Sequence, residues 1–508
     1  MRKALIGAVA GLGAALLLAL GPAGAALAAP QPPVELVPPA IVADGAFAVA
    51  TSPDGALIYV YSVYDGELSI LDTATNTPAA PPVSATIELS LLNPTMLVHP
   101  DGRIFILDPG DSGAVDPAVI EVDPATWTTT RHSLALPAPA AVGWALSMAM
   151  TPAGDKLYVS DLVNGVVIAV EVPDEAGIGG WSITPIDVSG ETGTLPGSLA
   201  IGGGLLYAAD ATGETAGGPA RIAVIRTADD GLEPDLIEYT APAGTIDGIL
   251  DFPTLAADPA GTTVLLIASA EIDDGSGDYG GYLWSIPAGT VPATPTYLGA
   301  SPGGEVAAAT VAPGGATAYL LDCACASTAW TLSVANAAWT ELDLSGATDL
   351  ELLVSMAITP DGTRLLLGGY NDLGDSLLWQ LTTVAHDTLL VTGPTTVEQG
   401  GSATLGALGA DNSGNPIDLT RLVDYTSSVD TDTFDGNVVT FPHASPHTIT
   451  ASYAPVGLPP VATGALTIEV TPVLPPTGVD AAAPALLASG LLLGGGLLLA
   501  LRRRRAAA

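Results

Sequence analysis

The stretch that decides the fold is Ser52-Pro53-Asp54-Gly55, followed by Ile58-Tyr59-Val60 and by Leu68-Ser69-Ile70-Leu71-Asp72. Before the turn, Val49 and Thr51 alternate with smaller residues, and period-two alternation is typical of a strand. A β-branched and aromatic run leaves the turn, so the two runs predict a β-hairpin. The run at 68–71 follows after a short loop and predicts a third strand.

The Pro-x-Gly turn recurs roughly every fifty residues along the chain. It has seven copies, the fourth shortened to three glycines, at 53–55, 100–102, 152–154, 202–204, 259–261, 313–315 and 360–362. A third and a fourth strand-like run follow the hairpin in the first copies. Seven four-stranded units suit a β-propeller, in which radial repetition leaves only short edges. The sequence therefore predicts an all-β, seven-bladed propeller over residues 31–384.

These repeats resemble the YVTN or lactonase-like propeller family, most closely over residues 52–77, which end in Asp72-Thr73-Ala74-Thr75-Asn76-Thr77. The resemblance weakens in the fourth and fifth repeats. It implies a propeller fold, but a shared fold does not transfer lactonase activity. The last repeat contains three strands, so we expect residues 33–37 of the mature N-terminus to supply its fourth strand and close the ring.

Short β-rich runs continue beyond residue 386, at 395–405, 424–428, 448–453 and 465–470. Strands of this length and spacing predict a small β-sandwich over residues 386–472. The segment resembles a bacterial Ig-like domain. That resemblance implies a spacer of the kind found as a stalk on surface proteins.

The N-terminus has the pattern of a secretory signal. Arg2 and Lys3 precede an apolar run at 4–20, and Ala26-Leu27-Ala28 forms a small-x-small cleavage site. A basic start, a short apolar run and such a site are typical of a cleaved signal peptide. We therefore expect residues 1–29 to be removed on export.

The C-terminus combines the motif Leu474-Pro475-Pro476-Thr477-Gly478 with an apolar run at 481–501 and four arginines at 502–505. The run is long enough to cross a bilayer as a helix, and the arginines favour the cytoplasmic side. The order of these features resembles an LPXTG sorting signal, here 473–508. Without that resemblance, the segment predicts a plain membrane helix.

The LPXTG resemblance implies that a sortase cysteine attacks the Thr477 carbonyl and transfers the chain to a peptidoglycan amine. The membrane contact would then be transient, before sorting. The expected location is the cell wall of a Gram-positive bacterium, with sortase and peptidoglycan as partners.

The charge balance is strongly acidic, with 13 Lys and Arg against 53 Asp and Glu and a formal net charge of −40 at pH 7. Such a surface repels nucleic acid. It favours solubility, or else attracts cations or a basic partner. We therefore expect no nucleic-acid ligand, and the unknown surface ligand of the propeller is expected to be cationic if charge selects it.

The loops between second and third strands should all open on one face of the propeller, and none contains Lys or Arg. Four aspartates end the preceding strand, each three residues after an aromatic residue. They are Asp108, Asp161, Asp210 and Asp322. Clustered carboxylates repel unless a cation neutralises them, and oxygen ligands favour calcium. The alternative is that each Asp caps its own loop through backbone amides.

A catalytic site is not evident from the sequence. Only His99 and His132 fall within the propeller, and no acid and base pair can be assigned. We therefore predict a sortase-anchored binding or structural module with no catalytic residues. The alternative is a wall-tethered, lactonase-like hydrolase.

Overall fold

The computed structural model describes residues 35–473, apart from 43–45, 88–94, 111–114, 137–144, 174–180, 190–194, 212–218, 243–244, 246–250, 259–260, 273–278, 323–327, 343, 345–349, 372, 374, 385–388, 412–414 and 455–461. Every named element in it is a strand. The predicted signal peptide and sorting signal lie outside the described residues. No helix long and apolar enough to cross a bilayer occurs in the described part of the chain.

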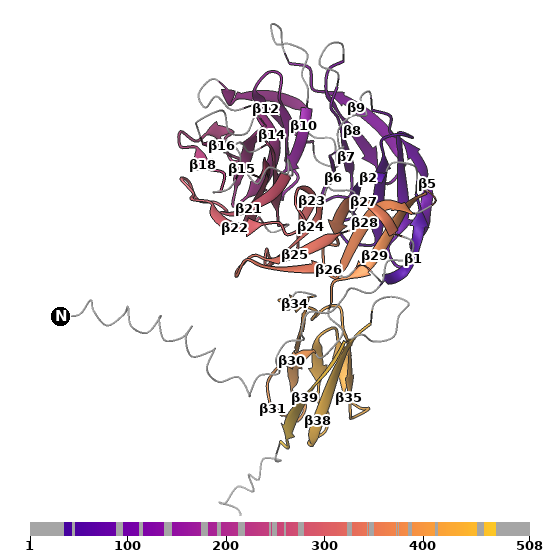
Figure 1. Ribbon diagram of the computed structural model, residues 1–508. Coiled ribbons are helices and arrows are strands. Elements are labelled where there is room, and N and C mark those ends of the chain that lie inside the picture. The colour runs from indigo at the N-terminus through magenta and orange to yellow at the C-terminus, as the bar shows by residue number, and fades with distance from the viewer. Residues whose placement is uncertain are drawn as a thin grey trace, which may run out of the picture. The chain divides into compact units, whose positions relative to one another are not determined.

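Most strands belong to a series of antiparallel sheets (Figure 1). In chain order the sheets are β2-β3-β4-β5 (Ala46–Thr51, Leu57–Ser62, Glu67–Asp72, Thr77–Ser84), β6-β7-β8-β9 (Met96–Val98, Ile104–Asp108, Ala118–Asp123, Thr128–Ser133), β10-β11-β12-β13 (Ala145–Met150, Lys156–Asp161, Val166–Glu171, Ser182–Asp187), β14-β15-β16-β17 (Pro196–Gly202, Leu205–Asp210, Ala220–Arg226, Gly231–Leu232) with β18 (Ile237–Tyr239) also on β16, β19-β20-β21-β22 (Asp251–Ala257, Thr263–Glu271, Tyr279–Pro287, Thr296–Ala300), β23-β24-β25-β26 (Val306–Val311, Thr317–Asp322, Ala329–Ser333, Ala338–Leu342) and β27-β28-β29-β1 (Leu350–Ile358, Arg364–Asn371, Ser376–Thr382, Glu35–Ile41).

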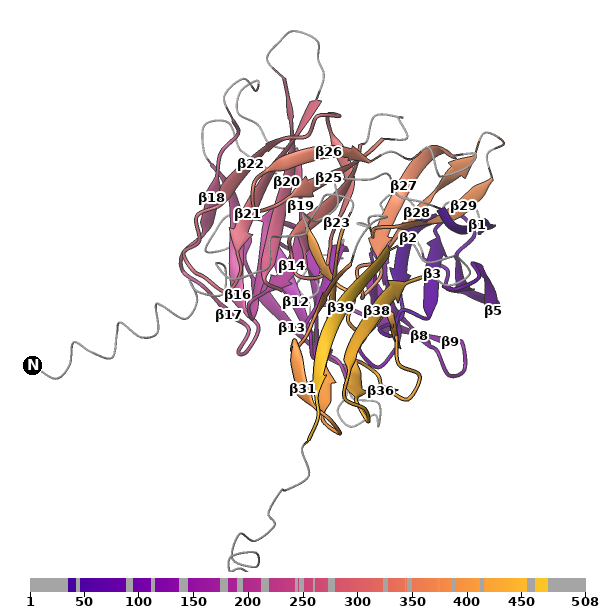
Figure 2. The same ribbon diagram turned by 90° about the horizontal axis from the view of Figure 1, so that it is seen from below.

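The first strands of these sheets form a closed ring. They contact one another in the order β2, β6, β10, β14, β19, β23 and β27, and β27 contacts β2. Figure 2 shows β27 beside β2, where the ring closes. A ring of radially arranged four-stranded sheets is a β-propeller, so the predicted all-β propeller fold is confirmed. The strand expected at 33–37 is β1, which spans Glu35–Ile41 and pairs antiparallel with β29.

The Pro-x-Gly turns join the first and second strands of the sheets. In the first copy the Gly55 N–H donates to the Ser52 carbonyl at 2.9 Å, and Gly55 has φ +70°. Only glycine adopts this left-handed backbone at little cost. The Asp54 carboxylate accepts a hydrogen bond from the Ser52 hydroxyl at 2.6 Å, which lowers the pKa of Asp54. The recurring Pro-Asp-Gly motif is therefore explained by turn chemistry.

The core lies between neighbouring sheets. Tyr59 of β3 packs with Ile104 of β7 on one side, while Val60 packs with Leu366 of β28 on the other. Because adjacent strand residues point to opposite faces, β3 is apolar on both faces. Each central strand is therefore a continuous buried run, which explains why the second strands contain little polar alternation.

The chain divides into two compact units. Among the described residues the second unit comprises 391–406, 425–451 and 465–473, whereas 407–411, 415–424, 452–454 and 462–464, placed in the sandwich by sequence, group with the propeller. Among the described residues the remaining strands form the sheets β31-β39-β38-β35 (Thr396–Glu398, Ala462–Thr471, Pro446–Tyr453, Asp424–Ser427), β32-β37-β36 (Ser402–Thr404, Val438–Thr440, Thr433–Asp435) and β30-β33-β34 (Leu390–Thr392, Gly406–Ala410, Pro416–Asp418).

The second unit has its own small core. Val439, Phe441, Ile449, Ile468 and Val470 are at most 4% exposed and pack together. β31 joins β39 in parallel, whereas β32 and β36 pair with β37 in antiparallel register. This all-β core is compatible with the small sandwich that the sequence predicts.

Candidate functional site

The four predicted rim aspartates each end the second strand of a sheet. Asp108, Asp161, Asp210 and Asp322 are the last residues of β7, β11, β15 and β24. Their equivalent positions place them at one end of the ring, as the repeat predicts. All four are buried, at no more than 5% exposure.

Asp108 and Asp161 bond within their own sheets. The Arg131 guanidinium of β9 donates to Asp108 Oδ2 at 2.8 Å, and the Gly110 N–H donates to Oδ1 at 3.2 Å. Asp161 accepts the N–H groups of Val163 and Asn164, both at 3.1 Å. Both carboxylates therefore stabilise the turn that follows their strand.

Asp210 and Asp322 also have local donors. Asp210 accepts the Leu195 N–H at 3.2 Å, from the segment entering β14. Asp322 accepts the Trp330 indole N–H at 2.7 Å, from β25. These contacts tie each strand end to a neighbour in its own sheet.

Each of the four aspartates thus accepts hydrogen bonds from different donors. Among the described residues, no group of three or more His, Cys, Asp or Glu side chains could hold a metal ion. This geometry favours the loop-capping role over the predicted calcium rim.

We expect millimolar calcium to leave the melting temperature of the protein unchanged, because each rim carboxylate already accepts protein hydrogen bonds. Replacing all four aspartates by Asn should lower the melting temperature equally with and without calcium. Each lost charged hydrogen bond costs about 1.5–3 kcal/mol. Differential scanning calorimetry measures both effects. A calcium-dependent rise that disappears in the fourfold Asn variant would instead establish the cation rim.

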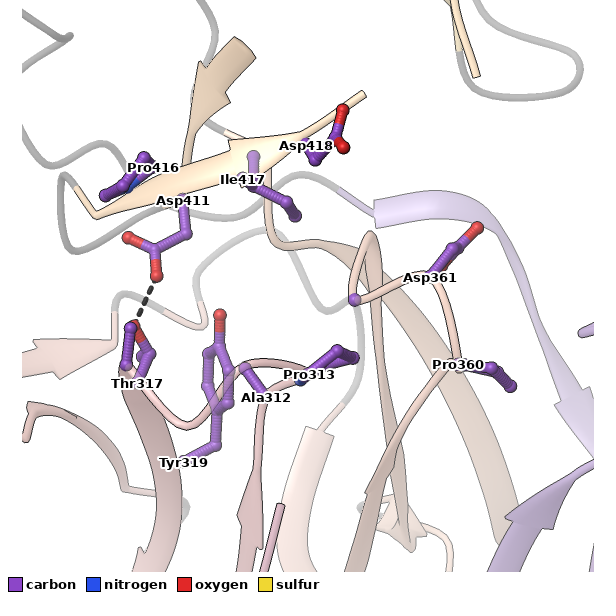
Figure 3. A pocket seen from close by; sticks show the side chains of 12 residues that line it. Ala312, Pro313, Thr317, Tyr319, Pro360, Asp361, Asp411, Pro416, Ile417 and Asp418 are labelled. Carbon is purple, nitrogen blue, oxygen red and sulfur yellow. Dashed lines mark hydrogen bonds between the residues drawn. The ribbon is translucent and has the colours of Figure 1, made fainter. Parts of the chain in front are cut away.

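A cavity of about 420 Å³ lies within the first unit (Figure 3). Its walls combine apolar and acidic side chains, and its lining contains no Lys or Arg. The lining residues are Ala312, Pro313, Ala316, Thr317, Tyr319, Pro360, Asp361, Gly362, Asp411, Pro416, Ile417 and Asp418. Burial raises the pKa of the fully buried Tyr319, so its hydroxyl stays neutral.

The carboxylates of this cavity are hydrogen-bonded to nearby groups. The Thr317 hydroxyl donates to Asp411, as Figure 3 shows, and the Asn415 N–H donates to Asp411 Oδ1 at 2.8 Å. The Asn415 amide also donates to Thr317 Oγ1 at 2.7 Å. The Thr420 hydroxyl lowers the pKa of Asp418. This network joins Asp411 and Asn415 to Thr317 of β24, so the cavity is best explained as a structural contact between these residues and the propeller.

A second set of polar residues bridges the sheets β6-β7-β8-β9 and β10-β11-β12-β13. His132 Nε2 lies 2.7 Å from Glu121 Oε2, and Arg103 donates to Glu121 Oε1 at 3.0 Å. Arg103 also donates to Asp101 at 2.9 Å, and His99 Nε2 lies 3.0 Å from the Gly154 carbonyl. The hydrogen bond with His132 is the main cause of the lowered pKa of Glu121.

This set of polar contacts was not predicted from the sequence. Its members are two to thirty-three residues apart, from the pair His99 and Asp101 to the pair His99 and His132, and strand pairing brings them together. The available signal was that Glu121 and His132 belong to consecutive predicted strands, which pair as β8 and β9 and bring an acidic side chain next to an imidazole. The ring of His132 stacks on Trp181 with a centroid distance of 3.8 Å, which makes the set an inter-sheet contact.

The predicted sortase motif, Leu474-Pro475-Pro476-Thr477-Gly478, lies outside the described residues. Its role therefore stays a prediction. The last described residue, Val473, is 56% exposed.

No family model and no curated protein matches this sequence. Solved structures similar to this chain include the Myceliophteria thermophila Cps50 (Swd1) β-propeller domain, which aligns at TM-score 0.47 and 13% sequence identity. The alignment covers 67% of this chain and 99% of that domain. Kuenenia stuttgartiensis hydrazine synthase aligns at TM-score 0.48 and 14% identity, covering 70% and 98%. A putative 6-phosphogluconolactonase from Bacteroides uniformis aligns at 0.43 and 14%, covering 60% and 86%. These likenesses say nothing about activity, substrate or partner.

Proposed function

We propose that this protein is exported, joined by a sortase to the cell wall of a Gram-positive bacterium, and displayed there as a binding module. In this proposal the ring is a seven-bladed propeller, and residues 386–472 are an Ig-like spacer between it and the wall. The sorting step rests on the motif at 474–478, the apolar run at 481–501 and the four terminal arginines.

The binding role rests on one observation, the absence of Lys and Arg from the acidic loops at one end of the ring. Arg103, Lys156 and Arg364 immediately precede or begin second strands, at the Pro-x-Gly end, and Arg226 ends β16 at that same end. The loops at the opposite end contain no Lys or Arg. Arg131 and Arg221 lie near this end, but they pair with Asp108 and Glu238. Acidic loops attract ligands of the opposite charge, so the loop end is the proposed binding face for a cationic ligand.

Deleting Thr477 and Gly478 should abolish covalent attachment to peptidoglycan, because the sortase loses its cleavage bond. The variant should be found in the membrane fraction or the medium. Muramidase digestion followed by immunoblotting measures wall-linked protein. Deleting Pro472 and Val473 is the matched control and should leave attachment intact. Release of both deletion variants in the same wall-linked form would refute the proposal.

A further inference from the structure

Large apolar side chains are exposed at the tips of equivalent loops. Tyr64 is 63% exposed, between β3 and β4; Val163 is 42% exposed, between β11 and β12; and Leu373 is 79% exposed, between β28 and β29. All three loops join the second and third strands of a sheet. Gly66 and Gly165, two residues after Tyr64 and Val163, both have positive φ, which makes these two turns equivalent in shape.

These tips lie at one end of the ring, because equivalent strands run in the same direction around it. Hydrogen bonds between neighbouring sheets fix this alignment. The Leu199 N–H donates to Ser147 Oγ at 3.1 Å, and the Leu255 N–H donates to Ser198 Oγ at 2.9 Å, each linking equivalent positions of consecutive first strands. The sheets that carry Leu373 and Tyr64 are neighbours, since β27 contacts β2.

Two further exposed side chains belong to the same end. Ile41 is 76% exposed and pairs with Leu377, next to the loop that carries Leu373. Tyr279 is 43% exposed and begins β21, directly after a loop of this end. Single exposed apolar residues are ordinary, but five of the nine large exposed apolar side chains among the described residues lie at this one end of the ring, which favours an interaction surface there.

The charges beside the apolar tips are negative. Asp65 follows Tyr64, and Asp375 lies two residues after Leu373, and both are exposed. Arg131 reaches this end but is held by Asp108 at 2.8 Å. The surface therefore offers apolar anchors with carboxylates next to them.

We infer that this loop end binds a polypeptide segment in which apolar side chains alternate with Lys or Arg. The inference rests on the proposed binding function and specifies its ligand. A small inorganic cation would use only the carboxylates, whereas apolar tips contribute only when an apolar partner covers them. Charge complementarity selects a basic segment over an acidic one.

The test uses the full-length chain immobilised at its C-terminus and three short synthetic peptides, in which Lys alternates with Leu, Lys with Ser, or Glu with Leu. Surface plasmon resonance should show the tightest binding for the Lys and Leu peptide. The Tyr64→Ser, Leu373→Ser double variant should raise its Kd by on the order of tenfold or more. Leu422→Ser, which removes a 37% exposed leucine from the segment 407–424, is the matched control and should bind like wild type.

The double variant Asp65→Asn, Asp375→Asn should weaken the binding of the Lys and Leu peptide and reduce the salt dependence of that binding. Thermal melts of each variant establish that the propeller is folded. The inference would be overturned if the Lys and Ser peptide bound as tightly as the Lys and Leu peptide. It would also be overturned if the Tyr64→Ser, Leu373→Ser variant bound the Lys and Leu peptide with an unchanged Kd. Neither result bears on wall attachment, which the deletion of Thr477 and Gly478 tests separately.

Discussion

Asp432→Ala should destabilise the second unit by about 1–3 kcal/mol, the cost of leaving buried hydrogen-bond donors without their acceptor. Asp432 Oδ2 lies 2.6 Å from His447 Nδ1, and both side chains are fully buried. Ser427 donates to the same oxygen at 2.6 Å, and the other ring nitrogen of His447 lies 3.0 Å from the His443 carbonyl. Loss of the carboxylate leaves this buried imidazole and hydroxyl without their acceptor.

Hydrogen exchange of peptides from 425–451 measures this loss of stability. Tryptophan fluorescence does not report on the second unit, because all seven tryptophans lie before residue 391. Asp430→Ala, an exposed neighbour, is the control and should change protection little. Replacing both partners, as Asp432→Leu with His447→Phe, should restore part of the stability, since the buried imidazole is then no longer left without its acceptor. Equal exchange in Asp432→Ala and Asp430→Ala would rule out a stabilising role for the pair.

The propeller could be predicted from the sequence because its determinants are local. A glycine with positive φ closes each Pro-x-Gly turn, and Gly55 and Gly362 show the same backbone 307 residues apart. The period-two runs on either side follow from strand geometry. The position of the rim aspartates at strand ends followed from the same repeat.

The side-chain partners of those aspartates could not be predicted, because they depend on register between strands. Asp108 meets Arg131 only because β7 and β9 flank β8. Trp330 reaches Asp322 across the β24-β25 pair, where Leu321 opposes Ala329. The sequence therefore predicted the row of carboxylates and offered backbone amides as their donors, but it did not predict the side-chain donors Arg131 and Trp330.

The hydrogen bond between Thr317 and Asp411 could not be predicted from the sequence either. Thr317 and Asp411 are separated by 94 residues and by the boundary that composition places near residue 386. The isolated bridge between Val384 and Asp411 shows why residues 407–424 group with the propeller. Long-range pairing of this kind has no local signature in one sequence.

Ring closure depends on a buried polar network as well as on strand β1. Arg364, the first residue of β28, donates to the Thr73 carbonyl at 2.8 Å and to Gln380 Oε1 at 2.9 Å. The Gln380 amide donates to Asn76 Oδ1 at 3.1 Å, and the Asn76 amide donates to the Leu378 carbonyl at 3.0 Å. These bonds join the last sheet of the ring to the first. Burial lowers the pKa of Arg364, because it removes solvent from the charged guanidinium.

Arg364→Ala should lower the free energy of unfolding of the propeller by on the order of 3 kcal/mol, because two buried acceptors lose a charged donor. Arg364→Met keeps most of the apolar stem and should lose nearly as much, which separates the lost hydrogen bonds from lost packing. Urea unfolding followed by tryptophan fluorescence suits this measurement, since Trp379 is fully buried in β29 beside Gln380. Arg421→Ala removes an exposed arginine and serves as the control. A shift for Arg364→Met no larger than that for Arg421→Ala would show that β1 and apolar packing close the ring without the network.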